Sequence, residues 1–418
     1  MNETERAVAD AHRHEWAFVL AATARVTGDF DLAEECVQDA YIAALDAWAR
    51  DGVPRKPGAW LTQTARRKAL DLLRRDKVFR AKMPLLVEPD PGGADVNLTD
   101  PDDIPDEIPD DRLRLVFTCC HPALAREAQV ALTLRLVCGV TTPDIARAFL
   151  VSEPTMAARI TRAKKKITAA RIPYRVPVAA DLPERLDAVL SVIHLLYTTG
   201  HTAPSGAGLV RTDLVDRAVA LTRMLLALMP DEPEVRGLLA LLLLTDARRA
   251  SRTDARGRLV VLEDQDRSLW DRRAIAEGRD LAVAAFRTGR AGRYALQAAI
   301  ASLHAVADSP ATTDWRQIVA LYGLLLKIWP SPVVALNRAV AVAMVDGPAA
   351  ALEEVDLLAT DERLAGYHYL PAVRADLLRR LKRHEEAAGA YRAAIALADN
   401  EAERKFLESR LAEVVDSP

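Results

Sequence analysis

Apolar residues recur along most of the chain at the three- and four-residue spacings of amphipathic helices. The clearest stripe runs from Met156 to Ile167, where apolar side chains stand at i, i+4, i+7 and i+11. Runs rich in Val, Ile and Thr and bounded by turn residues, which would indicate strands, are absent from the sequence. The pattern therefore predicts an all-α protein.

Two interruptions of this pattern divide the chain. Helical periodicity stops between Pro84 and Pro109, and the stretch from Glu88 to Asp111 has ten acidic residues and no Lys or Arg. Such a composition cannot bury enough apolar area to fold by itself, so it predicts a flexible acidic linker. Prolines at 173, 177 and 183 mark the second interruption. The expected parts are residues 1–82, the linker 83–110, residues 111–175 and a C-terminal extension, 176–418.

The end of the extension contains an internal repeat. A shift of 36 residues superposes three small or apolar positions on three others, namely Ala339 on Ala375, Ala351 on Ala387 and Val355 on Tyr391. Small side chains at matching positions let paired helices touch, and residues 369–397 resemble a tetratricopeptide unit. The repeat predicts two stacked helical hairpins. Residues 186–310 are expected to be helical without such a repeat.

Composition and charge narrow the class of protein. A length of 418 residues exceeds what one core usually organises, which agrees with several domains. The formal net charge of -3 by itself argues against a nucleic-acid-binding protein. The charges are unevenly distributed, however, since the acidic linker offsets basic segments at 66–82 and 159–175, and each segment can attract its own partner. The sequence has neither an apolar run long enough to span a bilayer nor a secretory signal. We expect a cytoplasmic protein that does not bind membranes.

The sequence offers no pattern of residues for catalysis. The four cysteines are too few and too irregularly spaced for a disulfide framework. Cys119, Cys120 and His121 lack the spacing of zinc ligands, and His194 and His201 have no neighbouring nucleophile or carboxylate pattern. A phosphate-binding glycine loop is also absent. We therefore expect no enzyme activity, no metal and no cofactor.

Residues 141–167 have the layout of a helix-turn-helix. Thr141 and Asp144 resemble a capping box for a short helix whose Ile145, Ala146 and Phe149 face inward, and Ser152 follows the turn at Leu150 as the N-cap of a second helix. The second helix buries the stripe from Met156 to Ile167. Its other side carries residues suited to contact bases or phosphates, although a basic helix can also be a simple solvated face. The candidate DNA-binding residues here are Ser152, Thr155, Arg159, Arg162, Lys164 and Lys165.

Residues 29–48 predict another amphipathic helix, whose start Asp31 and Glu34 are expected to cap. Its inward stripe is expected to consist of Val37, Tyr41, Leu45 and Trp48, and its other side is acidic with one apolar residue. Such a face suits a docking surface, and it also fits an ordinary surface helix. The candidate docking residues are Glu34, Glu35, Gln38, Asp39 and Ile42.

Residues 56–82 predict a helix that Pro57 begins and that is basic outside its buried stripe. Its cations could follow a DNA backbone. Trp60 could stack on an unpaired base or pack into the core. The candidate DNA-binding residues of this segment are Trp60, Arg66, Arg67, Arg74, Arg75 and Lys77.

Taken together, these segments resemble extracytoplasmic-function sigma factors. Ser152, Thr155, Arg159, Arg162 and Ala163 fit the promoter-reading helix of that family, whereas Leu150 stands where the family usually has Gly and alanines 157 and 158 where polar residues are common. The resemblance implies that residues 1–82 bind the β′ clamp of core RNA polymerase and open the minus-ten element of promoter DNA. It also implies that residues 111–175 bind the minus-thirty-five element and that the linker threads toward the active centre and the RNA exit path. The expected partners on core polymerase are the β′ clamp and the β subunit.

Residues 112–140 and 259–271 resemble a subgroup of this family with a long helical C-terminal extension. Where the subgroup usually has Asn-Glu-Gly-Tyr, this sequence has Thr198-Thr199-Gly200-His201. We expect the extension to regulate initiation in cis or to bind a regulatory protein. Two other interpretations stay open, namely a helix-turn-helix regulator that senses a ligand through its repeats, and a repeat scaffold without a DNA function.

Overall fold

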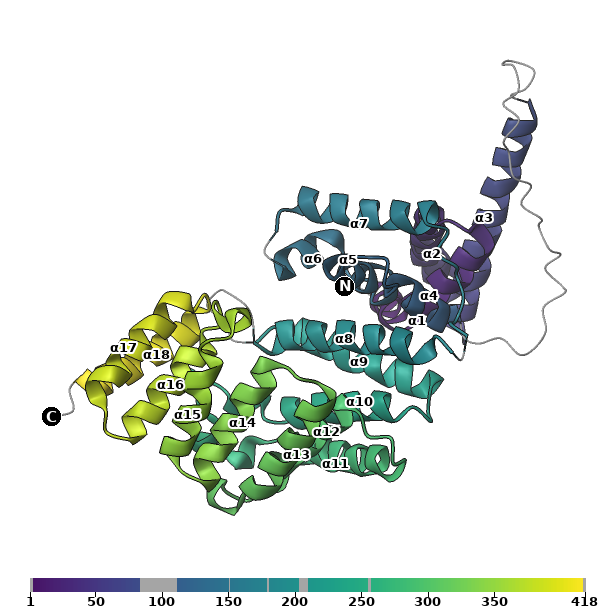
Figure 1. The fold of residues 1–418 in the computed structure, drawn as a ribbon. Coiled ribbons are helices and arrows are strands. Elements are labelled where there is room, and N and C mark those ends of the chain that lie inside the picture. Colours follow the sequence, from purple (N-terminus) through teal and green to yellow (C-terminus); the bar gives the residue numbers. More distant parts are fainter. Residues whose placement is uncertain are drawn as a thin grey trace. The chain divides into compact units, whose positions relative to one another are not determined.

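The part of the chain that the structure describes is mostly helical (Figure 1). The computed structural model describes residues 3–82, 111–149, 151–178, 180–202, 210–254 and 257–415. Within these ranges the β-structure is limited to one isolated bridge between Thr253 and Leu259, which confirms the all-α prediction. The acidic linker and Leu150 lie outside the described residues. The chain forms two compact units, Met1–Val192 and Ile193–Pro418.

The first unit begins with three helices that pack on one another. They are α1 (Glu3–Thr27), α2 (Phe30–Asp51) and α3 (Pro57–Lys82). After the linker follow α4 (Asp111–Cys119), α5 (Arg126–Leu132), a π-helical turn (Thr133–Val137), α6 (Thr142–Ala148) and α7 (Glu153–Ala169). α8 (Leu182–His201) contains the boundary between the two units.

Two details of α2 differ from the sequence prediction. The helix is capped by Asp29, whose carboxylate accepts hydrogen bonds from the backbone N–H groups of Asp31 and Leu32 at 2.7 and 3.0 Å. Leu45 is 41% exposed, and Ala44 is buried in its place. Ala44 follows Tyr41 by three residues and precedes Trp48 by four, so it lies on their side of the helix, whereas Leu45 lies about 100° further round. The small Ala44 lets α2 approach its neighbours closely.

The helix-turn-helix forms as the sequence predicts. Ser152 caps α7 by accepting a hydrogen bond from the Thr155 N–H at 3.3 Å. Thr141 accepts one from the Asp144 N–H at 3.3 Å and donates its hydroxyl to the Asp144 carboxylate at 2.6 Å. Phe149, which we expected to face inward, is only half-buried. The whole predicted stripe of α7 is buried, namely Met156, Ile160, Ala163 and Ile167.

The second unit continues as antiparallel helices (Figure 1). These helices are α9 (Thr212–Leu228), α10 (Pro233–Asp246), α11 (Arg272–Arg287), α12 (Arg293–Val306), α13 (Trp315–Ile328), α14 (Pro332–Val345), α15 (Pro348–Leu358), α16 (Tyr369–Arg380), α17 (His384–Leu397) and α18 (Glu401–Val415). Between α10 and α11 the chain leaves the helical pattern and forms short 3-10 turns and the isolated bridge. This break is longer than the sequence prediction allowed.

Two contacts fix α10 against α12. The carboxylate of Glu234, in the first turn of α10, accepts hydrogen bonds from the backbone N–H groups of Gly292, Tyr294 and Ala295 at 2.9–3.1 Å and so caps α12. Gly237 lies one turn later, and a Cβ there would stand 2.5 Å from the Ala295 nitrogen. The absence of a side chain at this position therefore sets how closely the two helices approach.

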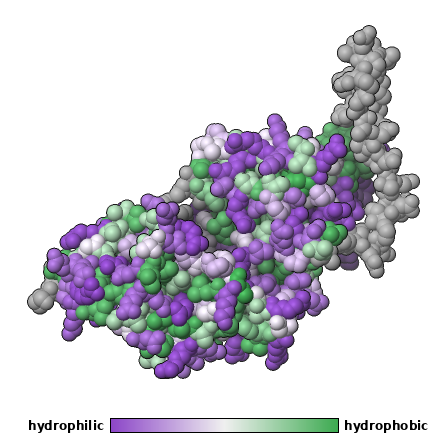
Figure 2. All heavy atoms as spheres, in the orientation of Figure 1, coloured by the Kyte–Doolittle hydropathy of each residue, from purple (hydrophilic) through white to green (hydrophobic). Residues whose placement is uncertain are grey.

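The predicted repeat forms two helical hairpins, α14 with α15 and α16 with α17. The alanines that superpose under the 36-residue shift are all fully buried. They share one core with Val355 and Tyr391, which confirms the stacked hairpins. On the face drawn in Figure 2, polar and apolar side chains are interspersed over the surface. Surface hydropathy alone therefore does not identify a binding face.

Candidate nucleic-acid interface

The outer side of α7 presents a row of polar and cationic side chains opposite its buried stripe. Thr155, Arg162 and Lys165 are exposed and Arg159 is half-exposed. The Arg162 Nε donates to the Ala158 carbonyl at 3.2 Å, which holds the guanidinium along the helix. Ser152 is exposed as well, but its hydroxyl already serves the N-cap. These groups can donate to base acceptors and to phosphate oxygens.

Lys164 differs from its neighbours because it is buried. Its ammonium group donates to Asp31 at 2.6 Å and to Glu34, both on α2. Glu34 also forms an ion pair with Arg135 at 2.8 Å. Burial lowers the pKa of Lys164, but the charge of Glu34 and the hydrogen bonds that the ammonium group donates to both carboxylates outweigh burial and raise the pKa above its usual value.

This network changes the interpretation of two candidate residues. The sequence predicted that Lys164 contacts phosphates and that Glu34 lies on a docking face, yet their side chains are only 10% and 8% exposed. In the folded chain they bind each other. Position 164 is adjacent to the buried stripe, so its long side chain reaches across to α2 instead of into solvent. We name the group Asp31, Glu34, Arg135 and Lys164 the α2–α7 network.

Other hydrogen bonds also connect the two halves of the first unit. The indole N–H of Trp16 donates to the Leu136 carbonyl at 3.0 Å, and the Tyr174 hydroxyl donates to the Ala21 carbonyl at 3.1 Å. Arg25 and Asp111 form an ion pair at 3.4 Å. Residues 111–175 therefore lie directly against residues 3–82 in this structure.

The basic residues of α3 divide into exposed and partly buried ones. Arg67, Arg74 and Arg75 are exposed, as expected for a surface that follows a DNA backbone. Arg66 is half-buried, and burial together with the nearby charge of Arg25 lowers its pKa. The side chain of Lys77 lies outside the described residues.

Trp60 lies at the start of α3 and is only partly exposed. Its ring packs edge-on against the buried ring of Trp48, with the centroids 5.7 Å apart. This contact favours the core role for most of the ring. The exposed remainder is the part that a base could reach.

The outer side of α2 presents most of the expected docking residues to solvent. Glu35 and Gln38 are exposed, and Ile42 is 61% exposed. Asp39 forms an ion pair with Lys68 of α3 at 3.0 Å. An exposed isoleucine among polar and acidic neighbours can become the buried centre of a protein contact.

Sequence reasoning missed several residues that join the two halves of the first unit. Arg135 stands in the apolar run 130–140, and an arginine in such a run signals a buried ion pair. Tyr174, whose hydroxyl donates to the Ala21 carbonyl, gave no comparable signal.

Three other features were considered, namely a reactive thiol, a metal site and a membrane-spanning helix. Burial raises the pKa of Cys120 to about 11, and its sulfur lies 3.5 Å from the Thr133 hydroxyl, so the thiol is protonated and packed in the core. Within the described residues, no three His, Cys, Asp or Glu side chains converge to hold a metal ion. None of the helices seen there has both the length and the apolar character needed to cross a membrane.

Comparisons with known proteins found family models that match three separate parts of the chain. The model of Sigma-70 region 2 matches residues 13–78, and that of Sigma-70, region 4 matches residues 114–167. A family of unknown function, DUF6596, matches residues 185–286. The chain is 46% identical over 399 residues to Uncharacterized protein R00370 of Rhizobium meliloti (strain 1021). These matched residues make up 96% of this chain and 94% of that protein. No solved structure matches the chain.

The matched regions coincide with the structural elements described above. Region 2 lies within α1–α3, and region 4 covers α4–α7 with the helix-turn-helix. Sigma regions 2 and 4 are the parts of a transcription initiation factor that bind core RNA polymerase and promoter DNA. The chain belongs to the extracytoplasmic-function sigma factors that carry a C-terminal extension.

Proposed function

We propose that α7 reads the minus-thirty-five element, that α2 and α3 engage core polymerase and the minus-ten element, and that the C-terminal unit controls this activity. The observation that carries the proposal is α7 itself. A capped helix with one fully buried stripe holds Arg159, Arg162 and Lys165 on its free side. A major groove admits one α-helix, and such side chains reach base edges and phosphates when the helix lies in it.

The polymerase contact is proposed for the outer side of α2. Ile42 supplies apolar area, and Glu35 and Gln38 surround it with polar groups. A partner would bury Ile42 and leave the polar residues at the rim, which is the usual anatomy of a protein interface. Asp39 would reach the partner beside its ion pair with Lys68.

Promoter binding would require the first unit to open. The two promoter elements are about 25 base pairs apart, which is about 85 Å of duplex at 3.4 Å per base pair. α7 has 17 residues, so it spans only about 26 Å at 1.5 Å per residue. Contacts such as the 2.6 Å bond between Lys164 and Asp31 cannot persist while both elements are read. We infer that the α2–α7 network breaks in the initiation complex and exposes Glu34 to polymerase.

Reconstituted transcription tests the sigma activity directly. Purified core polymerase is combined with a set of candidate promoters, with and without this chain. Initiation that depends on adding the chain is the expected result. Initiation that is the same without it would contradict the proposal.

The polymerase contact has its own test in the variant Ile42→Glu. Because Ile42 is 61% exposed, the charge should leave folding intact while it abolishes binding to core polymerase. Val178→Glu is the matched control, since Val178 is 53% exposed in the same unit. An ordinary helix-turn-helix regulator would not bind core polymerase at all, so a lack of binding by the unsubstituted chain would favour that alternative. Unchanged core binding by Ile42→Glu would exclude the outer side of α2 as the contact.

Control by the C-terminal unit is tested by truncation. A chain that ends at residue 177 would lose the hydrogen bond from Arg185 to the Phe117 carbonyl at 2.6 Å, which lies within the first unit. A chain that ends at residue 192 keeps it. We expect the longer truncated chain to show altered promoter output or polymerase affinity relative to the full chain. If neither the promoter output nor the polymerase affinity of this chain changed, control by the extension would be refuted.

A further inference from the structure

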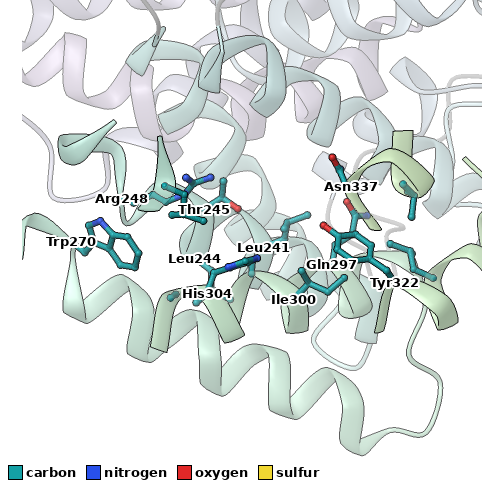
Figure 3. A pocket seen from close by; sticks show the side chains of 15 residues that line it. Leu241, Leu244, Thr245, Arg248, Trp270, Gln297, Ile300, His304, Tyr322 and Asn337 are labelled. Atoms are coloured by element: carbon teal, nitrogen blue, oxygen red, sulfur yellow. The ribbon is translucent and has the colours of Figure 1, made fainter. Parts of the chain in front are cut away.

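A cavity of about 370 Å³ lies in the second unit among α10, α12, α13 and α14 (Figure 3). Its polar side chains gather at two separate ends. Arg248, Thr245 and His304 lie at one end, and Gln297, Tyr322 and Asn337 lie at the other. Apolar side chains, among them Leu241 and Ile300, line the space between the ends. This volume is typical of sites for small molecules. We name it the Arg248 cavity.

Arg248 is partly buried and, among the residues that the structure describes, has no acidic partner. Neither Asp nor Glu lines the cavity, and none of the described carboxylates lies within ion-pair distance of its guanidinium. The adjacent Arg249 pairs with both Asp216 and Asp246, at 2.9 and 2.7 Å. A partly buried charge without a counter-ion is unfavourable unless something outside the chain compensates it.

The described groups near Arg248 carry no negative charge that would balance its positive charge. Burial and the charges of Arg248 and Arg267 lower the pKa of His304 to about 4, so this imidazole is neutral near pH 7. Arg267 donates to the carbonyls of His304 and Ala307, which are uncharged. The Arg248 end of the cavity therefore combines an excess of positive charge with neutral hydrogen-bonding groups.

The lining near Arg248 is held in place by its neighbours. The Trp270 indole N–H donates to the Ser251 hydroxyl at 2.8 Å, and the guanidinium of Arg267 lies 4.5 Å from the centre of the Trp270 ring. Asn337, at the other end, is exposed and marks where the cavity opens. A ligand would thus enter beside Asn337 and meet preorganised groups at the inner end.

We propose that the Arg248 cavity binds a small organic monocarboxylate, with the carboxylate paired to the Arg248 guanidinium and the apolar body between Leu241 and Ile300. A carboxylate accepts two parallel hydrogen bonds from a guanidinium. One negative charge balances the charge of Arg248, the only arginine among the described residues that line the cavity, whereas a phosphate dianion would bring a second charge into it. Binding does not depend on the proposed function, but an effect of the ligand on transcription does.

Calorimetry on the purified full-length chain tests the proposal without polymerase. The probes are 4-phenylbutyrate, indole-3-acetate and octanoate, each compared with its primary amide, and phenyl phosphate. We expect the carboxylates to bind at least about tenfold more tightly than their amides, because an amide offers the guanidinium one neutral carbonyl oxygen in place of two charged ones. Equal affinity of acids and amides, tighter binding of phenyl phosphate, or no binding by any of the three carboxylates would overturn the proposal.

Two variants assign the effect to Arg248. Arg248→Gln should weaken carboxylate binding at least about tenfold and remove the preference for acid over amide. Arg290→Gln is the control, because Arg290 is exposed elsewhere in the same unit and should bind as the unsubstituted chain does. Thermal unfolding separates a binding role from a structural one. Loss of an uncompensated charge should leave the Tm of Arg248→Gln unchanged or higher, and a Tm lower by several degrees would overturn the assignment.

Discussion

Replacing Lys164 by Met tests the role of the α2–α7 network. The substitution keeps the apolar stem and removes the ammonium group that bonds to Asp31 and Glu34. Removing one partner of a buried ion pair usually costs about 3–5 kcal/mol. Glu34 would keep its ion pair with Arg135, and Asp31 is largely exposed, so we expect a smaller loss of about 2 kcal/mol.

The pH dependence of this contribution follows from the raised pKa of Lys164. A group whose pKa is higher in the folded state stabilises the fold in full below its unfolded pKa, and this contribution is lost as the pH rises through the folded value. The unfolded pKa of lysine is about 10.4. The full effect of Lys164→Met should therefore be present at pH 7 and should diminish only in alkaline solution above that value.

Urea unfolding at pH 7, followed by circular dichroism, measures the loss. Lys165→Met is the matched control, because Lys165 is exposed on the same helix. A free energy of unfolding for Lys164→Met within about 0.5 kcal/mol of the original chain, or an equal loss in the control, would refute the reasoning, since surface substitutions stay within that range.

Polymerase binding then separates the two roles considered for Lys164. If the network must open for initiation, weakening it by about 2 kcal/mol should raise the affinity for core polymerase by as much as about thirtyfold. If Lys164 contacts phosphates instead, the variant should show no such gain and should bind promoter DNA more weakly. An unchanged polymerase affinity would contradict the opening of the first unit.

Three further predictions concern α7 and the second unit. Arg162→Ala should weaken binding to the minus-thirty-five element by about 1–3 kcal/mol in a gel-shift titration, and equal binding of both proteins would exclude Arg162 from base reading. Gly237→Ala should lower the Tm by several degrees, because the added Cβ would stand 2.5 Å from the Ala295 nitrogen, and an unchanged Tm would contradict the close helix contact. Binding of 4-phenylbutyrate should be equal at pH 6 and pH 8, because the pKa of His304, lowered by burial, Arg248 and Arg267, is about 4 and its charge is constant above pH 5. Calorimetry at the two pH values would reveal a difference if His304 titrated there.

Features that depend on neighbouring residues could be predicted from the amino-acid sequence alone. The buried stripe of α7 follows from the helical period, and the N-cap at Ser152 depends on a residue three positions away. The stacked hairpins could be predicted because a 36-residue shift repeats small residues at contact positions. In each case the physical cause lies within one helix or one hairpin, so the local pattern contains the information.

Features that join distant segments could be seen only in the folded chain. The choice between Ala44 and Leu45 in α2 depends on how closely neighbouring helices approach, which the pattern within α2 does not specify. Lys164 and Glu34 are 130 residues apart, and each taken alone resembles an exposed charge suited to another partner. The Arg248 cavity draws its lining from α10, α12, α13 and α14. A partly buried charge is recognised only when everything around it is known, because its free energy depends on all the groups that surround it in space.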